Sequence, residues 1–306
     1  MKPPPFEYVA PRTLDEAVHE LADSDGEAKI LAGGQSLIPL LNFRLMRPAR
    51  LIDLNRIASL AYVTARDGGL AVGAMTRDAT VERDGRVAEQ LPLLDEAMRW
   101  VGHPAIRSRG TVGGNLAHAN PAAELPAVAV CLDATLTIVG PRGQRQVQAE
   151  DFFLGYLTTV LKWDEILTEA WYPAVAQRTG QAWLEFARRH GDFALAGVAV
   201  SLTVEHDLIE RARIVLTGVG GKPFRAREAE TLLVGGTIDE RAPAAADAVR
   251  SAIDPDADIH ASKEYRTHLA GVLTERAILV AYERVVAREP AALDVRRSLE
   301  HMGRYA

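Results

Sequence analysis

The N-terminal part of the chain alternates short apolar runs with amphipathic stretches. The apolar runs predict strands at residues 6–9, 28–32 and 50–54. After the first run, apolar residues recur at helical spacing, and Thr13 with Glu16 three residues later forms a capping box that predicts where a helix begins. A second helix is expected at residues 36–45, with Pro39 in its first turn. This segment therefore reads as a small β-α-β unit.

The central part mixes strands and helices without a regular repeat. Hairpins are expected near residues 70–74 and around Pro141-Arg142-Gly143, where strands at 134–139 and 145–148 would pair. Helices are expected at 79–82, 91–101 and 126–131, and a further strand at 166–171.

Strands precede helices in the last part of the chain. The strands are expected near residues 183–187, 196–205 and 209–216, and the helices at 225–233, 243–253 and 262–287. This order favours a three-stranded sheet covered by helices. The polar run 173–181 is interpreted as a linker, which predicts an α+β protein with one domain at 1–176, comprising subdomains of about 1–56 and 57–176, and a second domain at 177–306.

Two glycine pairs carry the strongest functional signal. Gly33-Gly34 and Gly113-Gly114 each follow a short apolar stretch and precede a plausible helix. Paired glycines permit positive φ and close approach of a ligand to the backbone, and successive N–H groups near a helix start can bind an anion. Two such turns predict a diphosphate held from two sides, as in a dinucleotide cofactor. Neither matches the GxGxxG of a nicotinamide site or the GK[ST] of a P-loop.

Composition and charge narrow the classes of protein. The chain has 306 residues, 48% of them hydrophobic and 25% charged, and a net charge of −6, which argues against a mainly electrostatic nucleic-acid partner. Its single cysteine, Cys131, excludes a disulfide framework or an iron–sulfur cluster held by this chain alone. No apolar run approaches the ~18 residues of a membrane span, and no secretory signal is recognised, so a cytoplasmic protein is expected.

Longer motifs surround both glycine pairs and recur along the chain. They lie at residues 32–39, 109–126, 151–155, 165–167, 188–194, 218–226 and 265–273. Together these motifs resemble the FAD-binding medium subunit of the molybdenum hydroxylases. That family includes the medium subunits of aerobic carbon monoxide dehydrogenase and of nicotine- and caffeine-type dehydrogenases, and the FAD-binding subunit of xanthine dehydrogenase.

The resemblance implies a fold and a set of cofactor contacts. The N-terminal two-thirds would be the two-subdomain FAD-binding fold of vanillyl-alcohol oxidase-like (PCMH-type) flavoproteins, followed by the C-terminal domain of carbon monoxide dehydrogenase flavoproteins. The FAD diphosphate would lie on residues 32–36 and 111–115, and Phe193 would lie against the flavin ring. The implied cofactor-binding residues are Lys29, Ala32, Gly33, Gly34, Gln35, Ser36, Thr111, Gly113, Gly114, Asn115, Glu124 and Phe193, with no catalytic residue and no metal ligand.

Two positions depart from the family pattern. Phe193 stands where many relatives have tyrosine, so a hydroxyl contact near the flavin is not carried over, and Asn120 stands where aspartate is frequent. His118 follows the second glycine pair and is a further candidate for a position near the flavin.

The resemblance also implies an electron-transfer role within a larger enzyme. A separate large subunit would carry the molybdenum cofactor, a separate small subunit the [2Fe-2S] clusters, and the assembly would be a dimer of heterotrimers, a heterohexamer. This chain would pass electrons through FAD to an external acceptor. The alternative is a self-sufficient FAD-dependent oxidase or reductase, which reduction by NAD(P)H or a small substrate without partners would reveal. A third possibility is a binding module that has lost FAD, which the intact glycine pairs disfavour.

Overall fold

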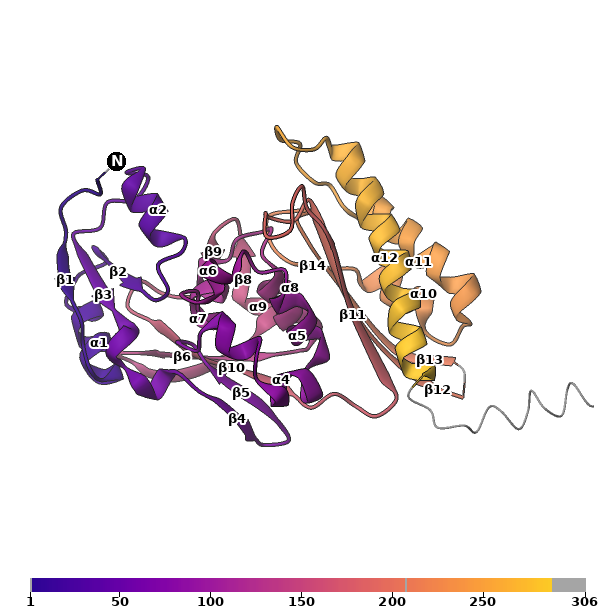
Figure 1. Ribbon diagram of the computed structural model, residues 1–306, viewed down its shortest axis with the longest axis horizontal. Helices are drawn as coiled ribbons and strands as arrows, with labels where there is room; N and C mark the ends of the chain where they lie inside the picture. Colours follow the sequence, from indigo (N-terminus) through magenta and orange to yellow (C-terminus); the bar gives the residue numbers. More distant parts are fainter. Residues whose placement is uncertain (1, 207, 288–306) are drawn as a thin grey trace, which may run out of the picture.

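A parallel three-stranded sheet forms the N-terminal unit of the computed structural model, which describes residues 2–206 and 208–287 (Figure 1). Its strands β1 (Glu7–Val9), β2 (Ala28–Leu31) and β3 (Arg50–Asp53) lie in the order β1-β3-β2, connected by α1 (Leu14–Ala22) and α2 (Leu37–Asn42). The side chain of Thr13 accepts a hydrogen bond from the Glu16 N–H, which confirms the predicted helix start. Strand β2 is an edge strand, so one side of its backbone faces away from the sheet.

The central unit contains a five-stranded antiparallel sheet and several short helices. Its strands, in the order β4-β5-β10-β6-β7, are β4 (Val63–Arg66), β5 (Gly69–Gly73), β10 (Ile166–Pro173), β6 (Thr135–Gly140) and β7 (Gly143–Gln148). The other elements are η1 (Leu54–Arg56), η2 (Ala58–Leu60), α3 (Asp78–Val81), α4 (Gly85–Gln90), α5 (Pro92–Met98), α6 (Pro104–Arg107), α7 (Val112–His118), α8 (Glu124–Cys131), α9 (Ala149–Phe152), β8 (Phe153–Gly155) and β9 (Thr158–Thr159). Every residue of α8 is buried, so this helix forms the middle of the central core.

The C-terminal sheet lies between two helical layers (Figure 1). Its long strands are β11 (Thr179–Phe186), β12 (Ala196–Glu205) and β13 (Leu208–Thr217); the two-residue β14 (Phe224–Arg225) extends the predicted three strands. Its helices are α10 (Arg227–Leu233), α11 (Ile238–Ala252) and α12 (Lys263–Val286). Successive side chains of β12 point to opposite faces of the sheet. Ala199 belongs to the central core, whereas Val198 and Val200 pack under the C-terminal helices.

The predicted linker is shorter than expected, because β11 already begins at Thr179. Polar residues occupy this strand start because they have partners: the hydroxyls of Thr179 and Thr203 lie 2.9 Å apart, and Gln181 accepts a hydrogen bond from the Leu93 N–H. Position 180 of the strand requires glycine because a Cβ there would lie 1.8 Å from the Ala281 carbonyl oxygen of α12. The polar and glycine signals thus reflect a cross-strand hydrogen bond to β12 and close packing against α5 and α12.

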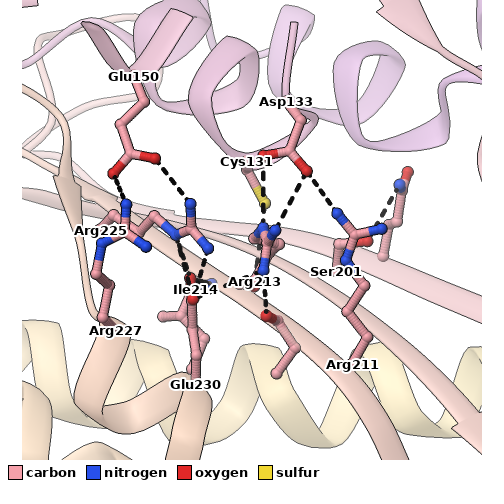
Figure 2. Close-up of polar contacts among 12 residues, drawn as sticks. Cys131, Asp133, Glu150, Ser201, Arg211, Arg213, Ile214, Arg225, Arg227 and Glu230 are labelled. Carbon is pink, nitrogen blue, oxygen red and sulfur yellow. Dashed lines mark hydrogen bonds and ion pairs between the residues drawn. The ribbon is translucent and has the colours of Figure 1, made fainter. Parts of the chain in front are cut away.

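Ion pairs join the central helices to the C-terminal sheet (Figure 2). Asp133, after α8, pairs with Arg211 at 2.6 Å and with Arg213 at 3.4 Å. Glu150 of α9 pairs with Arg225 at 2.8 Å and with Arg227 at 2.5 Å. Single surface ion pairs contribute little, but a network of several fixes the orientation of the joined elements. Among residues 2–206 and 208–287, no helix is both long and apolar enough to cross a membrane.

Candidate functional site

A cavity of about 1290 Å³ lies among the three units of the fold. Its lining comes from the loop between β2 and α2, from α7 and the start of α8, from the segment around β9, and from the loops after β11 and α11. All the cofactor-binding residues expected from the sequence line it: Lys29, Ala32, Gly33, Gly34, Gln35, Ser36, Thr111, Gly113, Gly114, Asn115, Glu124 and Phe193. The fold therefore brings together residues that are far apart in the sequence, in a space large enough for a dinucleotide.

The loop between β2 and α2 presents a row of unused hydrogen-bond donors. The backbone N–H groups of Gly33, Gly34, Gln35 and Ser36 donate to no residue that the structure describes. Gly34 has φ of +73°, which glycine adopts without strain, and Ser36 makes no side-chain capping bond at the start of α2. Consecutive free N–H groups in a concave loop form an anion site. This is the physical feature that fits a diphosphate.

The second glycine pair is not a turn, which corrects the expectation of two matching turns. Gly113 and Gly114 lie in the first turn of α7 and do not have positive φ. Their N–H groups are already used, because Gly113 donates to the Ala74 carbonyl at 2.8 Å and Gly114 to the Thr111 hydroxyl at 3.1 Å. A Cβ on Gly113 would lie 2.3 Å from the Ala74 Cβ, so this glycine is needed for close packing of α7.

The two glycine motifs pack directly on each other. An ideal Cβ on Gly33 would lie 2.3 Å from the Arg109 carbonyl oxygen and 2.8 Å from the Gly110 Cα. A Cβ on Gly114 would lie 3.3 Å from the Ala32 Cβ. The second motif therefore supports the first loop by direct contact.

A polar bridge, formed by the side chains of Asn55 and Arg77, also joins the loop after β2 to the segment before α7. The Asn55 amide donates to the Ala32 carbonyl at 2.9 Å and accepts from Arg77, whose guanidinium also donates to the Arg109 carbonyl. Asp53 orients Asn55 by accepting a hydrogen bond from its backbone N–H at 2.9 Å. Asn55 and Arg77 were not expected from the sequence, and their contacts fix the spacing between the loop and the start of α7.

Buried carboxyl groups set the electrostatics of the cavity wall. Burial raises the pKa of Asp78 to about 7, helped by the nearby Glu124 charge, and burial likewise raises the pKa of Glu124 to about 7. One oxygen each of Asp78 and Asn115 is buried without a partner among the described residues. A carboxyl with a pKa of about 7 is about half protonated at neutral pH, and its protonated form can donate a hydrogen bond. An unpaired acceptor fits a ligand rich in hydroxyl groups. Both properties suit a nucleotide with sugar hydroxyls.

The remaining residues lie at the two ends of the cavity. Phe193, 65% exposed, lines the end beside the C-terminal sheet. His118 also lines the cavity, and burial lowers its pKa. Trp163 and Lys162 line the cavity but were not expected from the sequence, because the run Lys162-Trp163-Asp164 carries no periodic signal. Within the described part of the chain, no cluster of three histidine, cysteine or acidic side chains is placed to hold a metal.

Two family models together match most of the chain. Residues 4–175 match the FAD binding domain in molybdopterin dehydrogenase, and residues 181–281 match the CO dehydrogenase flavoprotein C-terminal domain.

Relatives match over nearly their full lengths. The chain is 42% identical to caffeine dehydrogenase subunit beta of Pseudomonas sp. (strain CBB1), covering 97% of this chain and 100% of the relative. It is 40% identical to the 6-hydroxypseudooxynicotine dehydrogenase complex subunit alpha of Paenarthrobacter nicotinovorans, covering 93% and 97%.

Among solved structures, a chain of carbon monoxide dehydrogenase from Hydrogenophaga pseudoflava superposes with a TM-score of 0.91 at 38% identity, covering 93% of this chain and 99% of that chain. A chain of quinoline 2-oxidoreductase from Pseudomonas putida 86 superposes with a TM-score of 0.90 at 40% identity, covering 93% and 99%. The expected α+β FAD-binding fold and the expected cofactor, FAD, are thereby confirmed. The chain belongs to the family of FAD-binding medium subunits of molybdenum hydroxylases.

Proposed function

We propose that this chain is the electron-transfer subunit of a molybdenum hydroxylase, which receives electrons from an iron–sulfur subunit and delivers them through FAD to an external acceptor. The observation that carries the proposal is the row of unused N–H donors at Gly33–Ser36, placed on the wall of a cavity of dinucleotide size. The similarity to dehydrogenase subunits supports a role within a larger enzyme.

The chain's own residues would bind and orient the cofactor. FAD, when bound, supplies the redox chemistry, and the protein supplies position and electrostatics. The loop at 33–36 would hold the diphosphate, Asn115 and Glu124 would contact polar groups of the cofactor, and Phe193 would lie against the flavin ring. These individual contacts rest on the cavity lining and on the family motif.

The rest of the enzyme would reside on other chains. Cys131, the single cysteine, is buried and cannot by itself hold an iron–sulfur cluster, so clusters and molybdenum cofactor are assigned to a small and a large subunit. We infer a dimer of these heterotrimers in the cytoplasm, where a free thiol stays reduced. The matches at 4–175 and 181–281 support an FAD-binding domain at 1–176 and a second domain at 177–306. Substrate choice would belong to the large subunit.

The test combines a spectrum with the identity of bound chains. The chain purified from its native host is expected to show flavin absorption and to retain a molybdenum-type large subunit and an iron–sulfur small subunit by native mass spectrometry. Reduction of the isolated flavin-loaded chain by NAD(P)H or a small substrate would instead favour the self-sufficient oxidase or reductase. A colourless chain that does not take up FAD would contradict the cofactor role.

Asn55→Ala is expected to weaken FAD binding about fivefold. The substitution removes the bond to the Ala32 carbonyl and the acceptor for Arg77, so the loop loses part of its support. Fivefold corresponds to a loss of about 1 kcal/mol, the net contribution of a typical intramolecular hydrogen bond. The measurement is the FAD dissociation constant by titration of the apoprotein, beside its thermal midpoint.

The control is Gln144→Ala, which removes an exposed amide on β7 outside the cavity lining. This variant should bind FAD as the wild type does. Equal affinity in the Asn55 variant would show that the polar bridge does not position the loop.

A further inference from the structure

The cavity continues past the diphosphate loop to a second end that the family motif leaves unexplained. This end is lined by Gly26, Lys29, Lys162 and Trp163, next to the open edge of β2. The opposite end is lined by Phe193 and neighbouring residues. The row of free N–H groups lies in the loop that leaves β2, so a diphosphate there would have space on both sides.

Trp163 has the properties of a stacking platform. A Cβ built on Gly26 would lie 3.9 Å from the Trp163 Cγ and Cδ2, so the indole rests on a turn that carries no side chain. Gly26 has φ of +85°, a backbone conformation that glycine accepts without strain. The Trp163 side chain is still 52% exposed, and it lines the cavity.

Among the tryptophans in the described part of the chain, Trp163 is the one that forms neither an indole hydrogen bond nor a ring contact. The indole N–H groups of Trp171 and Trp183 donate to the Arg66 carbonyl and the Glu185 carboxylate, and Trp100 makes an edge contact with the ring of His190. The Trp163 indole N–H donates to no described residue. An indole that is supported on one side and free on the other is available to a ligand.

Positive charge accompanies this aromatic surface. Lys29 on β2 forms no ion pair with any described residue, and Lys162 precedes Trp163. An aromatic plane beside lysine side chains favours a purine base attached to phosphate. An acidic or purely apolar occupant would not use both features.

FAD carries one aromatic group on each side of its diphosphate. With the flavin at the Phe193 end, the adenine would reach the opposite end of the cavity. We propose that Trp163 is the stacking platform for the adenine of FAD, with Lys29 beside the adjoining phosphate. This inference rests on the proposed function, because it takes FAD as the ligand and takes the flavin to lie near Phe193.

The test separates the two halves of the cofactor. Trp163→Ala in the full chain is expected to weaken FAD and ADP by a similar factor of roughly 5- to 150-fold, the range for loss of one base–aromatic stack. Binding of FMN, which lacks the adenine, should not change. Trp163→Phe should restore most of the ADP affinity. Leu154→Ala, an exposed apolar residue outside the cavity lining, is the matched control and should bind all three ligands normally.

A spectroscopic readout identifies the residue directly. ADP should quench the part of the tryptophan fluorescence that is present in the wild type and absent from Trp163→Phe. Unchanged ADP affinity in Trp163→Ala, with FAD still bound, would overturn the inference and leave the proposed function intact. Weakened FMN binding with normal ADP binding would also overturn it, since the flavin would then occupy this end. Failure of the wild type to bind FAD at all would overturn the proposed function itself.

Discussion

Gly33→Val is expected to abolish stable FAD binding, with a loss of affinity of at least about 100-fold. Its Cβ would lie 2.3 Å from the Arg109 carbonyl oxygen. The backbone fixes the positions of both atoms, so no side-chain rotation relieves the clash. The loop must move away from the second motif, and the free N–H groups of residues 33–36 move with it. Preorganised donors lose most of their value when they are displaced by an ångström.

The measurement is the flavin-to-protein ratio after purification, followed by FAD titration of the apoprotein. Circular dichroism should show that Gly33→Val retains its secondary structure, because the altered loop is at the cavity and outside the hydrophobic clusters. Gly85→Ala is the matched control, since a Cβ there meets no atom within 4 Å and its φ is not positive. A Gly33→Val chain that carries a full complement of FAD would refute the role assigned to this loop.

For Gly113→Val we expect a loss of folding, in contrast to the loss of FAD binding expected for Gly33→Val. Its Cβ would lie 2.3 Å from the Ala74 Cβ, between α7 and the end of β5. Because this contact belongs to the framework, we expect the variant to be produced largely unfolded, as judged by circular dichroism and by protease sensitivity of the apoprotein. Normal folding with selective loss of FAD would instead assign Gly113 to the cofactor.

The first glycine loop could be predicted from sequence because its signals are local. An apolar strand, a glycine pair and a helix follow one another, and the structure has β2, the loop and α2 in that order. The second pair was misinterpreted because glycine disfavours helix interiors. Its true signal was Thr111, whose hydroxyl caps α7 by accepting from the Gly114 N–H. Glycine is required at position 113 because a Cβ there would lie 2.3 Å from the Ala74 Cβ, and at position 114 because a Cβ would lie 2.7 Å from the Thr111 hydroxyl oxygen.

Features that depend on distant partners could not be predicted. Asn55 supports Ala32 from 23 positions away, and Arg77 reaches Arg109 across 32 positions. The strand start at Thr179 looked like a linker because its polar residues find their partners only in the folded sheet. Sequence periodicity identifies which face of an element is buried, but not which polar groups meet after the units pack together.

Glu185→Gln is expected to stabilise the protein at alkaline pH. Glu185 is buried on β11, and burial, together with the nearby Glu124 charge, raises its pKa from 4.5 to about 9. One of its oxygens accepts from the Trp183 indole N–H at 3.2 Å, and the other has no partner among the described residues. The folded protein therefore favours the neutral carboxyl group, which a glutamine amide closely imitates in shape.

The sign of the pH dependence follows from these pKa values. Below pH 4.5 the carboxyl is protonated in the folded and the unfolded chain, and its stabilising contribution is fully present. Above pH 4.5 the unfolded chain ionises first, so stability falls as the pH rises toward about 9. At about 1.4 kcal/mol for each unit, the loss between pH 5 and pH 8 is on the order of 4 kcal/mol at most. Glu185→Gln removes this loss.

Urea unfolding of the FAD-saturated chain at several pH values tests the argument. The variant and the wild type should have nearly equal free energies of unfolding at pH 5, and the variant should be the more stable at pH 8. Glu89→Gln, an exposed position on α4, serves as control and should follow the wild type throughout. Asp78 and Glu124, whose pKa values burial also raises, should leave a residual decline with pH in the variant. Equal stability of the variant and the wild type at pH 8 would mean that Glu185 ionises in the folded protein at no cost in free energy. That result would contradict the argument from its burial beside Trp183.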